Sequence, residues 1–577
     1  MSELTRVSET PRVTELEDGT KVYRTAQWSP PGCHPVGCGL KLYVDENGKL
    51  AKVEGDENQP ITQGRLCVRC LTLKDYLYNP SRITYPLKRA KEHRGQADKW
   101  ERCTWDEALD IIEENYRRIT AEYGRESVVG FAGTGREGGT LGIWRSLTFR
   151  TCNWCYSQSG YACYVPRMAA AAYNIGSPYP EIDYAGGLAG RYDDPAFELP
   201  ECVVIWGKMP LASNPDGLFG HAVVDLMRRG SRLIVVDPRD IGLAAQADIH
   251  LKLRPGTNVT FAHGVVNYLI QHGLYDEDFV RERTEGFEIL AATVRDYTPE
   301  RVEAVCGIDR ADLVSAARMY AAADAAAIVY CLGVTEHSTG TDGVMALSNM
   351  AMVTGNLGKP GCGVNPLRGQ NNVQGACDMG AQPNQFPGYQ NVTDPVIREK
   401  FEKAWGVKLP GEIGVHATDV FPAAIRGEIK GLYIYGEDPV VTDPDTHHIL
   451  KALNSLDFFV VQELFMTETA QLADVILPGR SYAEKEGTFS NTERRVQRVR
   501  KAIEVPGNMR LDTDIICDLM RRMGYDQPTL TAAEIFDEMA ELTPSFHGMS
   551  HERLDHTDGQ YLQWPCATKD HPGTPIM

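Results

Sequence analysis

Short apolar runs that end in glycine or an acidic residue recur along this chain, and they constrain its fold more than any other feature. The clearest are "SVVGFAG", "CVVIWG", "RLIVVDP", "AAIVYCLG", "GLYIYGEDP" and "FFVVQELF". Helical stretches such as "HAVVDLMRRG" and "RADLVSAARMYAAA" lie between them. Because buried parallel strands read as continuous apolar runs and need crossover helices, the pattern predicts an α/β fold with doubly wound parallel sheets. Ligands of such folds bind at the carboxyl ends of the strands.

The size and charge of the chain narrow the classes of function. A length of 577 residues is too great for one core and predicts roughly three or four domains. The net charge of −19 argues against nucleic acid as a partner. No apolar run is long enough for a membrane span, and the polar first residues carry no export signal. We therefore expect a cytoplasmic protein with a small-molecule substrate, whose 15 cysteines are thiols or metal ligands.

Local signals predict three further features. The region up to residue 86 should form short strands, with a hairpin through Asn47-Gly48. The next segment, "TWDEALDIIEENYRRITAEYG", should be a helix with Thr104 as its N-cap and Gly124 as its stop. Residues 367–388, "LRGQNNVQGACDMGAQPNQFPG", lack apolar periodicity and are interpreted as a long functional loop.

Two close cysteine pairs near the start of the chain indicate a metal site. Cys33 and Cys38 are separated by four residues, and Cys67 and Cys70 by two. The spacing suits a zinc site and an iron–sulfur cluster equally, and burial of some thiols without metal is a third reading. Another close pair, in "CNWC", is interpreted as packing rather than as a redox pair or half of a zinc site.

The order of motifs resembles the dimethyl sulfoxide reductase family of molybdenum or tungsten enzymes. The first 180 residues, with "GCGLKLYV", "GRLCVR" and "WERCTWDEALDII", are similar to acetylene hydratase and its relatives. From about Val203 the chain is similar to formate dehydrogenase catalytic subunits. That similarity rests on "GTDGVMALSNMAMVTGNLGKPGCGVNPLRGQNNVQGACDMGAQPNQFPGYQ", "GEDPVVTDPD", "TETAQLADVILPG", "AEKEGTFSNTERRVQR" and "QWPCATKDHPGTP".

The resemblance implies the cofactors. These are molybdenum or tungsten held by two molybdopterin guanine dinucleotides, and one [4Fe-4S] cluster. Cys33, Cys38 and Cys67 match cluster ligands, whereas the first cysteine of the family pattern is absent. Cys70 is then a substitute ligand or an accident, His34 is another candidate, and a three-iron cluster stays open. Arg69 replaces the lysine that lies between cluster and pterin, which keeps the charge but not the shape.

The resemblance also implies a metal ligand and exposes a departure from the formate pattern. In "CYVPR", Cys163 stands where the family has the metal ligand, just before a short helix whose N-terminus would stabilise a thiolate. From the residues alone, a buried structural cysteine is the favoured reading. Formate dehydrogenases follow the ligand with a histidine and clamp formate with an arginine, but this chain has Tyr164 and Met345 at those places. Arg167 and His337 are the candidates to handle the substrate in place of these two residues.

Several strand ends carry residues that suit a dinucleotide. Bare glycine amides reach phosphate, and carboxylates accept hydrogen bonds from ribose or guanine. Each position alone is weak evidence, but their repetition in family order predicts two dinucleotide sites. The residues are Asn214, Asp237, Arg239, Gly256, Gly333, Gly369, Gln370, Asn371, Gly436 and Asp438.

We expect the following organisation and function. Residues 1–86 form an iron–sulfur domain completed by 460–577, residues 87–158 and 348–459 a first α/β pterin-dinucleotide domain, and residues 159–347 a second that carries the metal ligand. The family's final β-rich domain is missing after "HPGTP", so a separate subunit is expected to supply it, beside an electron-transfer iron–sulfur partner. The expected function is a formate dehydrogenase-like catalytic subunit. The alternatives are a hydratase or transhydroxylase and a non-catalytic electron-transfer subunit.

Overall fold

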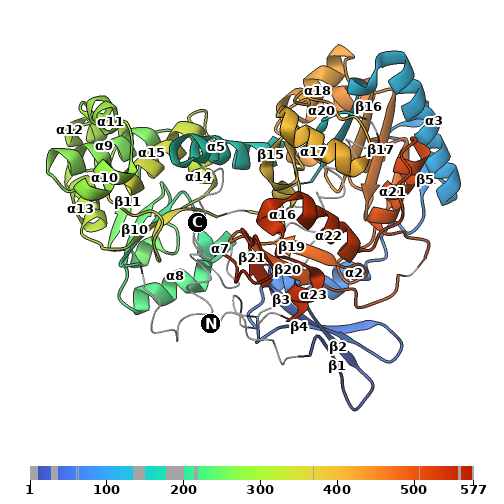
Figure 1. Cartoon of the computed structure of the whole chain (residues 1–577), viewed down its shortest axis with the longest axis horizontal. Coiled ribbons are helices and arrows are strands. Elements are labelled where there is room, and N and C mark those ends of the chain that lie inside the picture. Colours follow the sequence, from blue (N-terminus) through green and yellow to red (C-terminus); the bar gives the residue numbers. More distant parts are fainter. Residues whose placement is uncertain are drawn as a thin grey trace. The chain divides into compact units, whose positions relative to one another are not determined.

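The chain folds into two compact units in the computed structural model (Figure 1). The structure describes residues 11–26, 37–59, 62, 64–133, 148, 150–156, 158–176, 200–213, 219–367, 369–505, 507–556 and 561–574. Unit 1 comprises Met1–Asp56, Val68–Tyr161 and Gly369–Gly573; unit 2 comprises Glu57–Cys67, Ala162–Arg368 and Thr574–Met577. The domain boundaries expected from the sequence stay a prediction. Within the described ranges, no helix has the length and apolar character needed to cross a bilayer.

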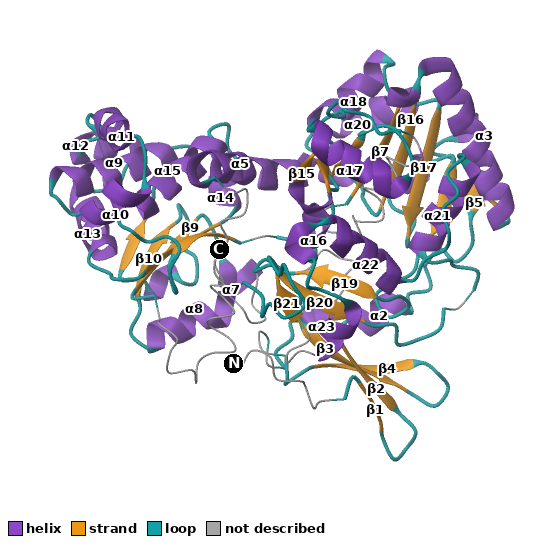
Figure 2. Ribbon diagram, viewed as in Figure 1, coloured by secondary structure: helices purple, strands orange, loops and turns teal. Residues whose placement is uncertain are grey.

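Unit 2 is built on a five-stranded parallel sheet. Its strands, in spatial order, are β11 (Ile249–Leu251), β10 (Arg232–Val236), β9 (Cys202–Trp206), β12 (Ala326–Tyr330) and β13 (Gly363–Pro366). Helices lie on both sides of this sheet (Figure 2). They are α7 (Pro210–Ser213), α8 (Phe219–Arg228), α9 (Asn258–Gln271), α10 (Glu277–Arg283), α11 (Phe287–Val294), α12 (Pro299–Cys306), α13 (Arg310–Ala321), α14 (Leu332–Thr335) and α15 (Gly340–Val353). This is the predicted doubly wound arrangement, which is confirmed.

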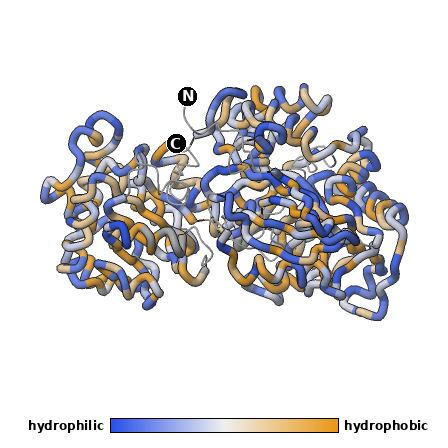
Figure 3. The backbone as a smooth tube through the Cα atoms, turned by 90° about the horizontal axis from the view of Figure 1, so that it is seen from below, coloured by the Kyte–Doolittle hydropathy of each residue, from blue (hydrophilic) through white to orange (hydrophobic). Residues whose placement is uncertain are grey.

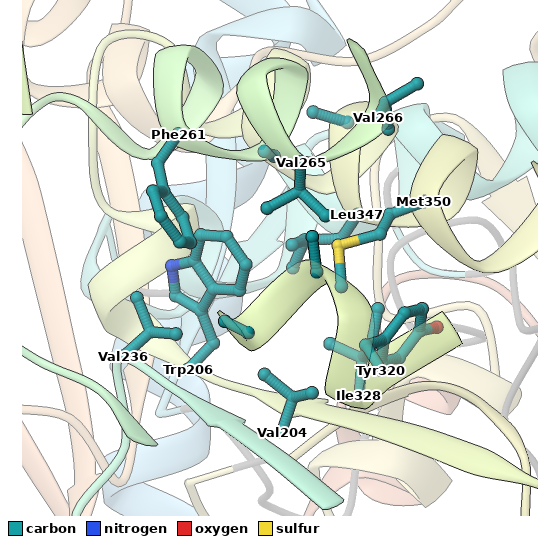
Figure 4. Close-up of a cluster of buried hydrophobic side chains, with 14 of the residues drawn as sticks. Val204, Trp206, Val236, Phe261, Val265, Val266, Tyr320, Ile328, Leu347 and Met350 are labelled. Atoms are coloured by element: carbon teal, nitrogen blue, oxygen red, sulfur yellow. The ribbon is translucent and has the colours of Figure 1, made fainter. Parts of the chain in front are cut away.

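The core of unit 2 joins the sheet to its helices (Figure 4). Val204 and Ile328 project from the central strands, and Val265 and Leu347 meet them from α9 and α15. The rings of Trp206 and Phe261 lie 5.4 Å apart between β9 and α9. Burial of these side chains stabilises the layer by roughly 1.5–3 kcal/mol for each large one, and it fixes the strand ends that surround the site described below.

Unit 1 contains a seven-stranded sheet whose central strands are parallel. In spatial order the strands are β6 (Glu101–Arg102), β5 (Leu87–Lys88), β18 (Val475–Pro478), β17 (Phe458–Glu463), β16 (Gly431–Tyr435), β7 (Val128–Ala132) and β8 (Trp154–Tyr156). The helices of this unit include α3 (Trp105–Tyr123), α17 (Pro395–Trp405), α18 (Ala417–Arg426), α19 (Pro439–Thr442), α20 (Thr446–Ser455), α21 (Asp512–Arg522), α22 (Ala532–Leu542) and α23 (His551–His556). Hydrophobic and hydrophilic stretches alternate along the tube in Figure 3, as expected of elements that bury one side.

Unit 1 also contains two antiparallel sheets of three and four strands. One is formed by β1 (Val13–Glu15), β2 (Lys21–Ala26), β3 (Gly39–Val44) and β4 (Leu50–Gly55), and is followed by α1 (Val68–Leu71) and α2 (Leu73–Leu77). The other is formed by β19 (Gly487–Ser490), β20 (Arg495–Val499) and β21 (Tyr561–Gln563). Arg500, just after β20, joins the two sheets: its N–H donates to Thr25 Oγ1 at 2.9 Å and its Nη1 to the Arg24 carbonyl at 2.8 Å.

Most local expectations are confirmed. All six apolar runs contain a strand, and β3 and β4 form the hairpin through Asn47-Gly48, with Gly48 at φ 75°. Thr104 Oγ1 accepts from the Glu107 N–H at 3.1 Å, and Gly124 ends α3 with φ 86°. The cysteines of "CNWC" are buried at the edge of the seven-stranded sheet, where Cys155 Sγ donates to the Val415 carbonyl at 3.2 Å.

The predicted long loop at 367–388 is partly wrong. It contains α16 (Val373–Asp378) and β14 (Gln385–Phe386), which pairs with β15 (Gln390–Asn391). Every residue of α16 is buried, including Gln374 and Asp378. A helix that is covered on all sides needs no polar face, so its sequence shows no amphipathic period.

Candidate functional site

A cavity of about 320 Å³ opens at the carboxyl ends of β9, β10 and β12 in unit 2. Four of the predicted residues line it: Asp237, Arg239, Gly333 and His337. Its size suits a bound small molecule or part of a nucleotide. Unit 2 therefore has a cavity at the strand ends where ligands of such folds bind.

Asp237 and Arg239 give this cavity one negative and one positive group. Asp237 is buried, and its Oδ1 accepts from the backbone N–H of Arg239 at 2.9 Å. The side chain of Arg239 stays 67% exposed, with its Nε 3.4 Å from the same oxygen. A carboxylate held in this way can accept hydrogen bonds from a nucleoside, and a guanidinium at the mouth can hold phosphate.

His337 was predicted as a candidate catalytic group, but it lies in this nucleotide-type cavity. Its Nε2 is 3.1 Å from the carbonyl oxygen of Gly333. Lys208 and Asn258 line the same cavity and were missed by the sequence reasoning. Asn258 connects strand ends and helix, since its Oδ1 accepts from Trp206 Nε1 at 2.8 Å and its Nδ2 donates to the Gly333 carbonyl at 3.0 Å.

Two glycines bring the ends of β9 and β12 together at this cavity. The Gly333 N–H donates to the Gly207 carbonyl at 3.2 Å, and a Cβ on Gly333 would lie only 2.6 Å from Gly207 Cα. Gly207 also has φ 61°, which favours glycine. The sequence predicted Gly333 as a phosphate-binding amide, whereas the structure shows that close backbone approach alone requires a glycine there.

Gly333→Ala is expected to distort this cavity. The new methyl group must displace backbone, which costs about 1–3 kcal/mol of unfolding free energy. Urea unfolding and the nucleotide content of the purified protein measure the two effects. Gly242→Ala is the matched control in the same unit, because its Cβ would meet only Leu211 Cδ1 at 3.4 Å. Equal behaviour of the two variants would contradict the close-approach argument.

A second cavity, of about 290 Å³, lies in unit 1 at the carboxyl ends of β16, β17 and β18. The predicted Gly436 and Asp438 line it. Asp438 also has a structural task, because its Oδ1 accepts from Thr469 N–H at 2.9 Å and from Thr469 Oγ1 at 2.6 Å. The carboxylate thus holds the loop that follows β17 while it faces the cavity.

Two cations of this second cavity were missed by the sequence reasoning. Lys485 Nζ donates to Asp512 Oδ2 at 2.7 Å, and both groups line the cavity. Arg480 lines it too, and its buried Nε has no hydrogen-bond partner among the described residues. A buried guanidinium N–H without an acceptor fits an anionic ligand such as phosphate. Arg480 follows β18 in "VILPGR", so the rule for strand ends could have found it.

The remaining dinucleotide candidates lie outside both cavities. Gly256 precedes α9 with φ 87°, next to Pro255, which lines the unit 2 cavity. Gly369, Gln370 and Asn371 precede α16 and line neither cavity. Asn214 lies outside the described residues.

Cys163 lies on α5 (Gln158–Ile175), within the helix rather than before it. The expected stabilisation by a helix N-terminus is therefore wrong, because the helix begins five residues earlier and accommodates Pro166 in its interior. Cys163 is partly exposed, whereas Tyr164 and Arg167 are 2% and 4% exposed. The Arg167 guanidinium carbon lies 5.3 Å from the centre of the Tyr164 ring.

Met345, which replaces the formate-clamping arginine, lies on α15 close to the end of α5. Asn174 of α5 donates from Nδ2 to the Met345 carbonyl at 3.0 Å and to Asn349 Oδ1 at 3.1 Å. The Met345 side chain packs partly buried against the apolar core of unit 2. It provides no charge for a carboxylate.

The four N-terminal cysteines differ in how far they are buried and in whether the structure describes them. Cys38 and Cys70 are buried in unit 1, Cys67 is partly exposed, and Arg69 is exposed on α1. Cys33 and His34 lie outside the described residues. In the part of the chain that the structure describes, no three His, Cys, Asp or Glu side chains are arranged to hold a metal ion. The cluster ligand set therefore stays a prediction.

Two cavities at the carboxyl ends of parallel strands, each large enough for part of a nucleotide, are typical of α/β proteins that bind nucleotide-type cofactors. Residues 82–522 match the molybdopterin oxidoreductases, and residues 31–79 match the molybdopterin oxidoreductase Fe4S4 domain. The chain belongs to the molybdopterin oxidoreductase family, and it is an oxidoreductase whose cofactors are a molybdenum or tungsten pterin and a [4Fe-4S] cluster. The Arg480 Nε, which has no partner among the described residues, fits an anionic group of the pterin cofactor, and the thiols of Cys38, Cys67 and Cys70 are of the chemical type that binds an iron–sulfur cluster.

Relatives extend the similarity over nearly the whole chain. The F420-dependent formate dehydrogenase 2 subunit alpha of Methanococcus maripaludis is 41% identical, over 94% of this chain and 76% of its own length. Formate dehydrogenase H of Escherichia coli is 37% identical, over 92% of this chain and 72% of its own. Acetylene hydratase from Pelobacter acetylenicus shares the fold, with a TM-score of 0.75, 24% identity, and coverage of 92% of this chain and 73% of that one.

Proposed function

We propose that this chain is the catalytic subunit of a formate dehydrogenase-like enzyme, which oxidises formate to CO2 and releases two electrons and one proton. The likeness to formate dehydrogenase α subunits over more than nine-tenths of the chain carries this proposal. When bound, the pterin-held metal supplies the two-electron redox chemistry. The protein's part is to hold the cofactors and to orient the substrate.

Each proposed residue has a task in that scheme. Cys163 binds the metal through its thiolate, which suits a soft molybdenum or tungsten centre. The two cavities hold the two guanine dinucleotides, one with Asp237 and Arg239 and the other with Gly436 and Asp438. Cys33, Cys38, Cys67 and Cys70 would hold the cluster, and the positive charge of Arg69 would lie between the cluster and a pterin.

Substrate orientation is assigned to Tyr164 and Arg167. Arg167 is the cation closest in sequence to the metal ligand, and its contact with the Tyr164 ring holds both side chains in place. A guanidinium can hold a carboxylate through two parallel N–H groups. Electrons would then leave through the cluster to an iron–sulfur partner. A cytoplasmic location stays a prediction.

Formate-dependent dye reduction tests this function. Protein purified without oxygen is expected to reduce a viologen dye when formate is added and not when acetate replaces it. Molybdenum, tungsten and pterin are measured in the same sample. Protein that carries the metal and the pterin but leaves the dye oxidised with formate would refute formate as the substrate.

A second candidate function is a hydratase or transhydroxylase. Tyr164 and Met345 favour it, since they stand where formate dehydrogenases have a histidine and an arginine, and a thioether cannot clamp a carboxylate. A bound metal would then act as a Lewis acid on water or a hydroxylated substrate. Hydration of acetylene without any electron acceptor, by protein inactive with formate, would establish this reading. Protein that contains neither metal would instead indicate an electron-transfer subunit.

A further inference from the structure

Gln497 joins strand β20 to the loop that carries Cys38. Its side chain is only 2% exposed, and its Nε2 donates to the carbonyl oxygen of Gly37 at 2.9 Å. Gly37 immediately precedes Cys38, which is fully buried just before β3. A side-chain amide from the far part of the sequence thus fixes the peptide group next to a proposed cluster ligand.

The contact at Gly37 is close as well as polar. Gly37 has φ 66°, a conformation that favours glycine. A Cβ on Gly37 would lie 2.0 Å from Gln497 Oε1, so no other residue fits without moving the amide. The hydrogen bond and the close contact both hold the peptide group of Gly37 in place.

Strand β20 carries the uncharged Gln497 among several buried arginines. Arg494, Arg495, Arg498 and Arg500 are all buried on or beside the same strand. A cation facing a pair of cysteine thiolates would add a full charge next to them, whereas an amide donates a hydrogen bond without adding one. Gln497, which donates to the Gly37 carbonyl from this strand, is uncharged.

We propose that Gln497 is a positioning residue for the iron–sulfur cluster. It fixes the Gly37 carbonyl and thereby the direction from which Cys38 presents its sulfur. Partners of this kind orient the ligands of metal sites, and their loss typically weakens metal binding by 10–100-fold. The inference rests on the proposed role of Cys38 as a cluster ligand.

Gln497→Leu tests this role, because it removes the donor and keeps most of the volume. The iron and acid-labile sulfide content per chain, the decay of the visible cluster absorbance in air, and the electron paramagnetic resonance spectrum of the reduced cluster are measured. We expect cluster loss in air to accelerate on the order of tenfold and the spectrum to change. Pterin content should stay at the parent level.

Gln563→Leu is the matched control. Gln563 lies on β21 of the same sheet, is 4% exposed, and donates from Nε2 to the Glu493 carbonyl at 3.0 Å. The Gln563→Leu variant therefore loses the same kind of buried bond, but keeps the bond from Gln497 to Gly37. We expect a similar drop in melting temperature for both variants and parent-like cluster properties only for Gln563→Leu. Cluster properties that match in the two variants would overturn the proposal.

Two further variants keep the outcome decisive. Should Gln497→Leu fail to fold, Gln497→Asn withdraws the amide from Gly37 by one methylene group and is scored in the same way. Cys38→Ala tests the ligand assignment on which this inference rests, because a methyl group cannot bind iron. A cluster that survives Cys38→Ala refutes the ligand assignment itself. Loss of the cluster in Cys38→Ala, together with parent-like behaviour of Gln497→Leu, refutes only the positioning role.

Discussion

Cys163→Ala is expected to abolish turnover while the protein stays folded. The side chain lies on α5 and is partly exposed, so its removal leaves no enclosed cavity in a core. The variant loses the only metal ligand that the proposed function takes from α5. We expect activity to fall by more than about 100-fold, since even groups that merely support a metal ligand are worth 10–100-fold. Dye reduction by anaerobic protein, with metal analysis of the same sample, measures the effect.

Cys306→Ala provides the control for this prediction. Cys306 is a buried cysteine of unit 2 whose Sγ donates to the Thr257 carbonyl at 3.7 Å. Burial raises the pKa of its thiol, which keeps it protonated and unsuited to bind a metal. Its replacement should leave turnover at the parent level. Full activity in Cys163→Ala would refute the metal-ligand assignment and, with it, the proposed catalytic centre.

Glu484→Gln is expected to destabilise unit 1 by about 3–5 kcal/mol. Glu484 is fully buried and accepts two parallel bonds from Arg82, with Nη1 at 2.8 Å and Nη2 at 2.7 Å. It also accepts from the Ser481 N–H at 2.6 Å. The substitution keeps the shape of the side chain but leaves the buried guanidinium without its counter-charge. Chemical unfolding of the purified chain, followed by fluorescence, measures the loss.

An exposed arginine–glutamate pair that also forms two hydrogen bonds is the control for that substitution. Arg426 donates to Glu428 through Nε at 2.8 Å and Nη2 at 2.7 Å, but both side chains are more than half exposed. Water solvates either charge after its partner is removed, so Glu428→Gln should hardly change the unfolding midpoint. Equal losses in the two variants would show that burial does not determine how much the Arg82–Glu484 pair stabilises the protein.

The sequence predicted the elements whose signals are local. The six buried strands could be found because a parallel strand covered on both faces is apolar along its whole length. Asp237 and Gly436 could be placed in cavities because both directly follow such strands. Thr104 and Gly124 marked the ends of α3 because capping depends on a few neighbouring residues.

Features that depend on distant contacts could not be predicted. The need for glycine at both Gly207 and Gly333 arises only because β9 and β12 are neighbours in the sheet. Helix α16 escaped prediction because burial on every side removes the periodicity that reveals a helix. The start of α5 was misplaced because the family resemblance put Cys163 just before a helix, whereas in the structure the helix begins at Gln158 and has Pro166 in its interior.

The bond between Gln497 and Gly37 spans 460 residues of sequence, and this has a consequence for how the protein matures. The cysteine loop leaves the ribosome long before its partner strand is made, a delay of roughly 20–90 seconds at usual rates of synthesis. During that interval the cysteine thiols are not yet covered by β20. Iron delivered to the incomplete chain would reach cysteines that are not yet positioned. We therefore expect the cluster to be assembled after β20 has packed against the N-terminal sheet.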